Sequence, residues 1–237
     1  PKPIDSRLIS VVSSAVAKAA IDSGVAHRKI TDWDAYRAVL DNRLGKDNKL
    51  MRNLATKAKT NPKRVVFTEA DNYKVLKAAQ VARDEGIAKP ILLGNKEKID
   101  KLIEEYQLDL GDTPIIDPWL NTEEEKRAEF GDMLWKKRQR RGLTQYDARK
   151  LMRDRNYFGA MMVELGMADA MISGLTKKYG TPIKPALEII GVQPGVSKVA
   201  GLYMMVTKKG PYFFADTTMN ANPTSQELAD IAVLTAN

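Results

Sequence analysis

Short apolar runs alternate with amphipathic helix patterns from residue 64 onward, and this alternation limits the possible folds of the chain more than any other feature. The runs RVVFT (64–68), ILL (91–93) and PII (114–116) have the length and residue types of strands. The segments between them repeat apolar residues at the period of a helix. Strands joined by helices of this length usually pair in parallel, with helices on both faces of the sheet. The sequence therefore predicts an α/β fold, doubly wound around a mainly parallel sheet.

The residues before this alternation are predicted to be mostly helical. Two amphipathic patterns occupy residues 1–45, and Gly24 is expected to end the first of them. Residues 46–62 are polar and basic and end in an Asn-Pro pair, which indicates a linker or a partly helical hinge. We therefore expect a helical region, a linker and then the α/β region, which begins at residue 63.

Capping residues and turn signals predict further boundaries. A charged helix is expected over residues 123–141, acidic at its start and basic at its end, as the helix dipole favours. Residues 199–216 are expected to form a β-hairpin, and the helix that follows opens with a capping box of Thr224 and Glu227. The other residues that we expect to cap helices are Asp71, Asn95, Thr144 and Asn156.

The composition excludes several classes of site. The chain has no cysteine, and its one histidine, His27, lies in a connecting segment and is interpreted as a surface residue. A cysteine nucleophile, a histidine-centred triad and a multi-histidine metal site are therefore excluded. No apolar run approaches the ~18 residues of a membrane span, and no signal-peptide pattern opens the chain, so we expect a cytoplasmic protein with no membrane partner. The chain begins without Met and stops within a helix pattern, so we expect it to be part of a longer protein.

The formal charge of +8 favours an anionic partner: nucleic acid, acidic lipid or a phosphorylated metabolite. The densest basic cluster lies in residues 136–141, where two interpretations stay open. It is either the solvated last turn of a helix or a phosphate or sulfate clamp that uses Arg138. Nucleic acid is disfavoured as a partner because aromatic residues are only 7% and no nucleic-acid-binding motif is present.

The stretch from residue 157 to residue 191 is the main candidate for a ligand site. It is predicted to contain an apolar helix (157–165), a turn at Gly166, a short buried strand (170–173) and a loop before a second helix. No Rossmann or P-loop glycine pattern is present, but hydroxyls and lysines beside glycines can bind a diphosphate or a 3′-phosphate. The candidate side chains at the strand end and in the loop are Ser173, Thr176, Lys177, Lys178, Tyr179 and Thr181. Asn220, near the end of the predicted hairpin, is either a site residue or a turn residue.

Several segments resemble the phosphate acetyltransferase family, and the resemblance extends over residues 62–236. The matching pieces include RVVFTEADNYKVLKAAQVARDEGIAKPILLG, RGLTQYDARKLM, YFGAMMVELGMADAMISG, TPIKPALEIIG and FFADTTMNANPTSQELADIA. The first 26 residues resemble instead the end of the catalytic region of bacterial malic enzymes. Both segments in tandem are typical of hybrid malic enzymes, in which a malic enzyme domain precedes a phosphate acetyltransferase-like domain.

This resemblance implies a division of the chain and a function for the whole protein. Residues 1–45 would be the helical tail of the malic enzyme region, 46–62 the linker, 63–187 the first α/β domain and 188–237 the start of a second, truncated α/β domain. The parent enzyme would oxidatively decarboxylate malate to pyruvate with NAD(P) and Mg²⁺ or Mn²⁺, bound outside this chain. The domain of this chain would bind acetyl-CoA as an effector and form a homo-oligomer, a dimer or larger.

The resemblance also assigns residues to acetyl-CoA or phosphate. Arg138 matches an arginine of the family, and Lys184 stands where the family has an arginine in a Thr-Leu-Arg-Pro motif. A lysine does not replace the bidentate phosphate fork of an arginine, so sensing is favoured over acetyl transfer. Two alternatives stay open: an active phosphate acetyltransferase, and a basic module that binds nucleic acid or acts as a scaffold.

Overall fold

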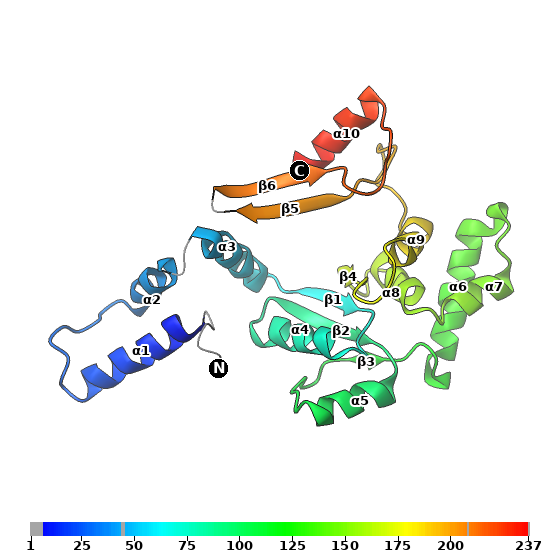
Figure 1. Ribbon diagram of the computed structural model, residues 1–237. Coiled ribbons are helices and arrows are strands. Elements are labelled where there is room, and N and C mark those ends of the chain that lie inside the picture. The colour runs from blue at the N-terminus through cyan, green and yellow to red at the C-terminus, as the bar shows by residue number, and fades with distance from the viewer. Residues whose placement is uncertain (1–6, 44–45, 208, 237) are drawn as a thin grey trace. The chain divides into compact units, whose positions relative to one another are not determined.

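The computed structural model describes residues 7–43, 46–207 and 209–236 (Figure 1). The chain divides into two compact units. We call Thr56–Lys198 the sheet unit, and Pro1–Ala55 together with Val199–Asn237 the hairpin unit. The domain limits inferred from the family resemblance stay a prediction, since compact units and family domains need not coincide.

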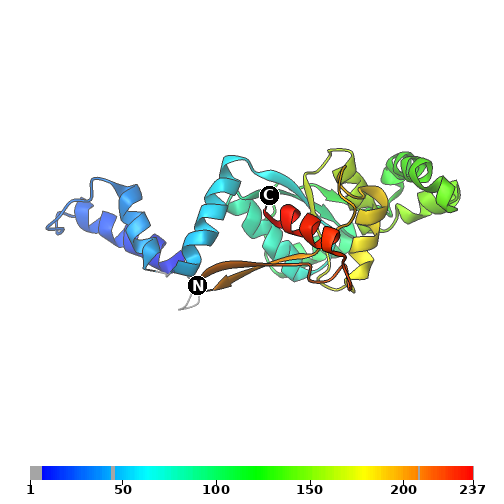
Figure 2. The same ribbon diagram turned by 90° about the horizontal axis from the view of Figure 1, so that it is seen from above.

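The sheet unit is built on a four-stranded sheet in which every pairing is parallel. The strand order is β3-β2-β1-β4. The strands are β1 (Lys63–Phe67), β2 (Ala88–Leu93), β3 (Ile115–Ile116) and β4 (Ala170–Ile172). The helices are α4 (Tyr73–Asp84), α5 (Lys96–Glu105), α6 (Glu124–Arg138), α7 (Gln145–Leu151), α8 (Arg155–Glu164) and α9 (Gly180–Ile189), and Figure 2 shows them around the sheet.

Alternate residues of the strands point to opposite faces of this sheet. Val66 and Leu93 belong to an apolar cluster with residues of α6, α7, α8 and α9. Their neighbours Phe67 and Leu92 belong to a second cluster, with residues of α4 and α5. Because a strand alternates its side chains at a period of two, the two clusters lie on the two faces. The predicted doubly wound α/β fold is confirmed.

Several predicted helix boundaries are confirmed. The side chain of Asn95 accepts a hydrogen bond from the Lys98 amide at 3.0 Å, and that of Thr144 accepts one from the Asp147 amide at 3.1 Å. The charged helix over residues 123–141 is also present, with a short 3₁₀ helix at each end of α6. These are η1 (Asn121–Glu123) and η2 (Gln139–Arg141).

Two predicted caps were wrong, because a neighbouring residue takes the capping role. Asn72, one residue after Asp71, accepts the hydrogen bond from the Lys74 amide and caps α4. Asp154, two residues before Asn156, accepts from the amides of the first turn of α8. In both places adjacent residues have similar capping propensities, so the sequence pattern did not decide between them.

Strand β4 was expected to be buried, and this prediction was wrong. Ala170 is exposed, and Ile172 has 54% of its surface exposed. In the part of the chain that the structure describes, β4 pairs with β1 alone and is an edge strand. An edge strand lacks a neighbour on one side, which its short apolar sequence does not reveal.

The hairpin unit contains three helices near the start of the chain and a hairpin followed by a helix near its end. The confirmed hairpin pairs β5 with β6 in antiparallel orientation, and Lys208 in its turn lies outside the described residues. Helix α3 covers most of the segment that was predicted to be a linker or a partly helical hinge, and its last residues lie in the sheet unit. The elements are α1 (Arg7–Asp22), α2 (Trp33–Asn42), α3 (Lys46–Thr60), β5 (Leu202–Thr207), β6 (Gly210–Ala215) and α10 (Ser225–Ala236).

Candidate functional site

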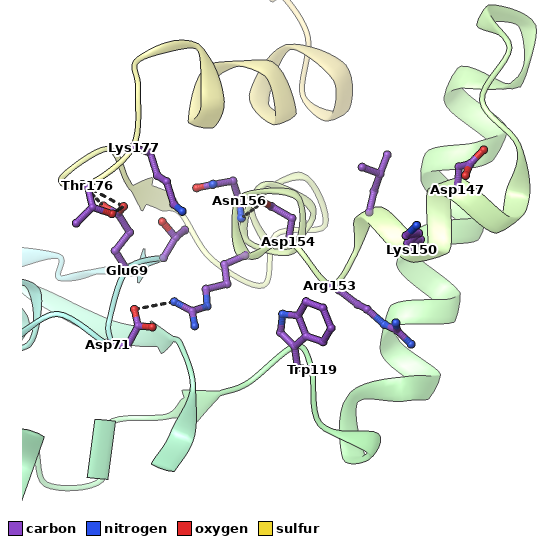
Figure 3. Close-up of a pocket in the computed structure, with 13 residues that line it drawn as sticks. Glu69, Asp71, Trp119, Asp147, Lys150, Arg153, Asp154, Asn156, Thr176 and Lys177 are labelled. Atoms are coloured by element: carbon purple, nitrogen blue, oxygen red, sulfur yellow. Dashed lines mark hydrogen bonds and ion pairs between the residues drawn. The ribbon is translucent and has the colours of Figure 1, made fainter. Parts of the chain in front are cut away.

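A cavity of about 790 Å³ lies in the sheet unit at the carboxyl ends of β1 and β4. The loop after β1 leads to α4 on one face of the sheet, and the loop after β4 leads to α9 on the other. Loops that leave adjacent parallel strands toward opposite faces open a crevice, and open α/β sheets bind ligands at this point. We call it the switch-point cavity. Its lining residues are Thr68, Glu69, Asp71, Trp119, Asp147, Lys150, Leu151, Arg153, Asp154, Arg155, Asn156, Thr176 and Lys177 (Figure 3).

Glu69 connects the loops that follow β1 and β4. Glu69 has only 7% of its surface exposed, and its carboxylate accepts hydrogen bonds from the Leu175 amide at 2.6 Å and from the Thr176 hydroxyl at 2.6 Å and amide at 3.2 Å. Burial pushes the pKa of the Glu69 carboxyl up, but these hydrogen bonds outweigh burial and hold it below its usual value. Glu69 is therefore ionised at neutral pH and fixes the loop after β4.

The first turn of α8 supplies the middle of the cavity wall. The Arg155 guanidinium donates to the Asp71 carboxylate at 2.7 Å, and the Ser173 hydroxyl donates to the side-chain oxygen of Asn156 at 2.7 Å. Burial alone would raise the pKa of Asp71, but the pairing with Arg155 lowers it. These contacts connect α8 to the loops after β1 and β4, so the three segments form one wall.

Three cations of the cavity have no ion-pair partner among the residues that the structure describes. Within the described part of the chain, no acidic side chain lies within ion-pair distance of Lys150, Arg153 or Lys177. The Arg153 guanidinium lies 5.5 Å from the ring centroid of Trp119, within reach of a cation–π interaction, and 61% of Trp119 is exposed. The cavity therefore offers unpaired positive charge and an aromatic face to an anionic ligand.

The structure brings two of the predicted site residues into this cavity, Thr176 and Lys177. Ser173 does not line it but is hydrogen-bonded to Asn156, which does. The remaining candidates in this stretch are exposed on the loop after β4 and on α9, outside the lining. They are Lys178, Tyr179, Thr181 and Lys184.

Arg138 and Asn220 make structural contacts elsewhere. Arg138 lies 3.4 Å from the Glu188 carboxylate, which also accepts a hydrogen bond from the Tyr157 hydroxyl at 2.6 Å. Burial, and then this carboxylate, raise the pKa of Tyr157. In the hairpin unit, the Asn220 side chain donates to Asp216 at 2.6 Å and to the Val199 carbonyl at 2.9 Å. Neither residue lines the switch-point cavity.

Sequence reasoning missed most of the cavity wall. Glu69 follows a predicted strand directly, and this position was a usable signal, because ligands bind at the carboxyl ends of parallel strands. Trp119, Lys150, Arg153 and Arg155 lie in loops and helices distant in the sequence, and nothing local distinguishes them from ordinary surface residues.

No membrane-spanning helix and no metal-binding group is found among the residues that the structure describes. None of their helices combines the length and apolar character needed to cross a bilayer. No three of their histidine, cysteine, aspartate or glutamate side chains are grouped to hold a metal ion. The sites for NAD(P) and for Mg²⁺ or Mn²⁺ were expected outside this chain, and that expectation stays a prediction.

Comparison with known proteins identifies the family to which this fold belongs. The model of the phosphate acetyl/butaryl transferase family matches residues 49–237. The EutD phosphotransacetylase from Staphylococcus aureus superimposes with a TM-score of 0.70 at 31% identity, over 79% of this chain and 56% of that one. The fold is therefore that of a phosphotransacetylase-like α/β protein.

The chain belongs to the phosphate acetyl/butaryl transferase family. It is also 37% identical, over its whole length of 237 residues, to the NADP-dependent malic enzyme of Salmonella typhimurium, and spans 31% of that relative. The phosphate acetyltransferase of Helicobacter pylori is 38% identical over 185 residues, which are 78% of this chain and 35% of that protein. Similarity to malic enzymes over the full chain and to phosphate acetyltransferases over most of it confirms the resemblance to hybrid malic enzymes.

Proposed function

We propose that this chain is the phosphate acetyltransferase-like part of a cytoplasmic malic enzyme and that it binds acetyl-CoA as an effector. The observation that carries the proposal is the switch-point cavity, which holds unpaired cations in a fold of the phosphotransacetylase class. Its volume lies within the ~300–1,000 Å³ of typical small-molecule sites. Coenzyme A carries several phosphate charges, and Lys150, Arg153 and Lys177 offer the opposite charge.

Sensing is favoured over acetyl transfer by the state of the carboxylates in the cavity. A transferase needs a base that takes the thiol proton from coenzyme A. All four acidic residues of the lining accept hydrogen bonds within the protein: Glu69, Asp71, Asp147 and Asp154. For Glu69 and Asp71 these contacts hold the pKa below its usual value, which makes both carboxylates weaker bases. Lys184, in place of the family's arginine, is exposed on α9 and lies outside the lining. These residues support binding of an acyl-CoA without chemistry on it.

The proposed whole protein oxidises malate to pyruvate and CO₂ with NAD(P)⁺ and a divalent metal ion. Relatives named NADP-dependent and NAD-dependent malic enzymes support this proposal. Acetyl-CoA would shift the enzyme between oligomeric arrangements that differ in activity. Such a shift requires a different affinity for acetyl-CoA in each arrangement, and coupling of this kind typically amounts to ~1–3 kcal/mol.

The test is a titration of acetyl-CoA into the full-length protein, with NAD(P)H formation and binding heat as the two measurements. We expect saturable binding and a change in the rate of malate oxidation. Lys177→Ala should weaken both effects, whereas Lys101→Ala, which removes the same charge from an exposed position on α5, should change neither. A protein that neither releases heat nor changes its rate would refute the proposal.

An active phosphate acetyltransferase is the second candidate, because the chain is similar to enzymes of that name over 78% of its length. It would form acetyl phosphate from acetyl-CoA and phosphate. The full-length protein should then make acetyl phosphate in the absence of malate, and Arg138→Ala and Lys184→Ala should reduce that rate. Binding of acetyl-CoA without acetyl phosphate formation would exclude this candidate and retain the first.

A further inference from the structure

A second, smaller cavity lies beside the switch-point cavity, and we call it the α6–α7 cavity. The residues that line it belong to the start of α6, to α7 and to the turn after α7. Two of them, Lys150 and Arg153, also line the switch-point cavity, on the side away from Glu69 in Figure 3. Its volume of about 260 Å³ is below the ~300–1,000 Å³ of typical small-molecule sites, so it suits a compact ligand.

Arg127 places a buried positive charge in the wall of the α6–α7 cavity. The residue is only 6% exposed, and its Nη1 atom donates to the Pro118 carbonyl at 2.7 Å and to the Leu120 carbonyl at 2.5 Å. No carboxylate of the described residues lies within ion-pair distance of this guanidinium. Two neutral carbonyls satisfy N–H groups but do not balance the charge, and a buried charge without a counterion is costly.

The other two nitrogens of Arg127 are available to a ligand. Nε and Nη2 form a pair of donors that can bind an oxyanion with two parallel hydrogen bonds. In the part of the chain that the structure describes, neither atom has a hydrogen-bond partner, and neither is sealed from solvent. Arg127 lines the α6–α7 cavity, so an anion in this cavity can reach the open pair of donors.

Positive charge exceeds negative charge in this lining. Arg127, Lys150 and Arg153 have no ion-pair partner among the described residues, whereas an aspartate of α6 accepts a hydrogen bond from Arg149 at 2.7 Å. Of the lining residues that the structure describes, only Glu124 is acidic. The three unpaired cations and this carboxylate leave a net charge of +2, which a dianion would balance.

We propose that the α6–α7 cavity binds a compact dianion, either inorganic phosphate or the phosphoryl group of a small metabolite. The donor pair of Arg127 holds two of its oxygens, and Lys150 and Arg153 balance the rest of its charge. The site is separate from the proposed acetyl-CoA site and does not depend on it. Arg138 and Lys184, which the family resemblance assigns to acetyl-CoA or phosphate, lie outside its lining.

The test is a calorimetric titration of the full-length protein, in chloride buffer, with inorganic phosphate and with glycerol 3-phosphate. We expect saturable binding of at least one of them. Arg127→Lys keeps the charge but loses the donor pair, and it should weaken binding by about tenfold, as should Lys150→Ala. Glu124→Gln removes the opposing carboxylate and should tighten binding by about threefold. Glu125→Gln, at an exposed position in the same turn and outside the lining, is the matched control and should change binding by much less.

The outcomes identify the ligand or overturn the site. Tighter binding of glycerol 3-phosphate indicates a phosphorylated metabolite, and tighter binding of inorganic phosphate indicates the free ion. The proposal is wrong if neither anion binds, or if Lys150→Ala and Glu124→Gln leave the dissociation constant unchanged. Both positions are exposed, so this result is decisive even if Arg127→Lys does not fold.

Lys177→Ala distinguishes the two cavities, because Lys177 lines the switch-point cavity alone. If this change weakens phosphate binding as much as Lys150→Ala does, the anion lies in the switch-point cavity and the separate site is wrong. Acetyl-CoA binding is measured independently. A protein that binds phosphate but not acetyl-CoA would keep this site and lose the proposed function, and the reverse result would keep the function and exclude the site.

Discussion

The strands of the sheet unit and of the hairpin unit contain similar apolar residues, but these residues are buried to different extents. Val66, Leu92 and Leu93 in β1 and β2 are fully buried between two layers of helices. In β5 and β6, Tyr203, Met205 and Phe213 are about half exposed, although the hairpin pairing is regular. The comparison shows that a local pattern is enough to form a strand, while burial depends on which other elements cover it.

The largest expected effect contrasts two phenylalanines. Phe158 in α8 is fully buried and packs against Phe130 with ring centroids 5.0 Å apart, whereas Phe213 in β6 is 53% exposed. Phe158→Ala should lower the free energy of unfolding by ~3–5 kcal/mol, because it leaves a cavity in the core. Phe213→Ala should cost less than ~1 kcal/mol. Urea unfolding of both variants measures the difference.

An equal loss of stability in the two variants would contradict this comparison. It would mean that the faces of the hairpin are covered in solution, by another copy of the chain or by another part of the protein. Sedimentation of the Phe213→Ala variant would then distinguish these cases, since only the loss of a partner copy lowers the mass of the particle.

Close packing of α6 on α7 gives the second prediction. A methyl group at Gly131 would lie 2.6 Å from the Arg149 Cα atom, whereas one at Gly180, the first residue of α9, would meet nothing within 4 Å. Gly131→Ala should therefore destabilise the protein by ~1–3 kcal/mol through overpacking. Gly180→Ala should be neutral or slightly stabilising, and thermal unfolding of this matched pair checks both.

Helix caps provide a local test that should not distinguish the two units. Thr144 in the sheet unit and Thr224 in the hairpin unit each accept a hydrogen bond from the amide three residues later, at 3.1 and 3.4 Å. Each Thr→Ala change should cost ~0.5–2 kcal/mol. Hydrogen exchange of the capped turns measures the effect, and a large loss in one unit alone would show that caps also depend on packing.

The smallest effect is the pH dependence of one exposed ion pair. Hydrogen bonds from the side chain and the backbone of Arg64 lower the pKa of Asp169 from 3.8 to about 2. Since the folded pKa lies below the unfolded one, the pair stabilises the protein above the usual pKa and loses this contribution as the pH falls toward about 2. The stability difference between the unmodified protein and Asp169→Asn should therefore shrink on acidification, as denaturant unfolding at several pH values would show.

Sequence reasoning recovered the features that depend on neighbouring residues. The strand and helix order, the hairpin and the caps at Asn95, Thr144 and Thr224 all follow from patterns a few residues long. It misjudged β4, because whether a strand lies at an edge depends on what pairs with it. Only a small part of the cavity wall was predicted: Thr176 and Lys177 belong to a recognisable loop, whereas Trp119 and Arg153 meet only after the chain has folded.

The hydrogen bonds that Glu69 accepts from the loop after β4 lower the entropic cost of ligand binding. By accepting three hydrogen bonds from Leu175 and Thr176, it gives the loop after β4 a fixed conformation before any ligand arrives. A ligand of the cavity then does not have to immobilise this loop, and preorganisation of this kind leaves more of the interaction energy for affinity. The carboxylate acts as a built-in anchor whose removal should slow association and raise the entropic penalty of binding, even for ligands that never touch it.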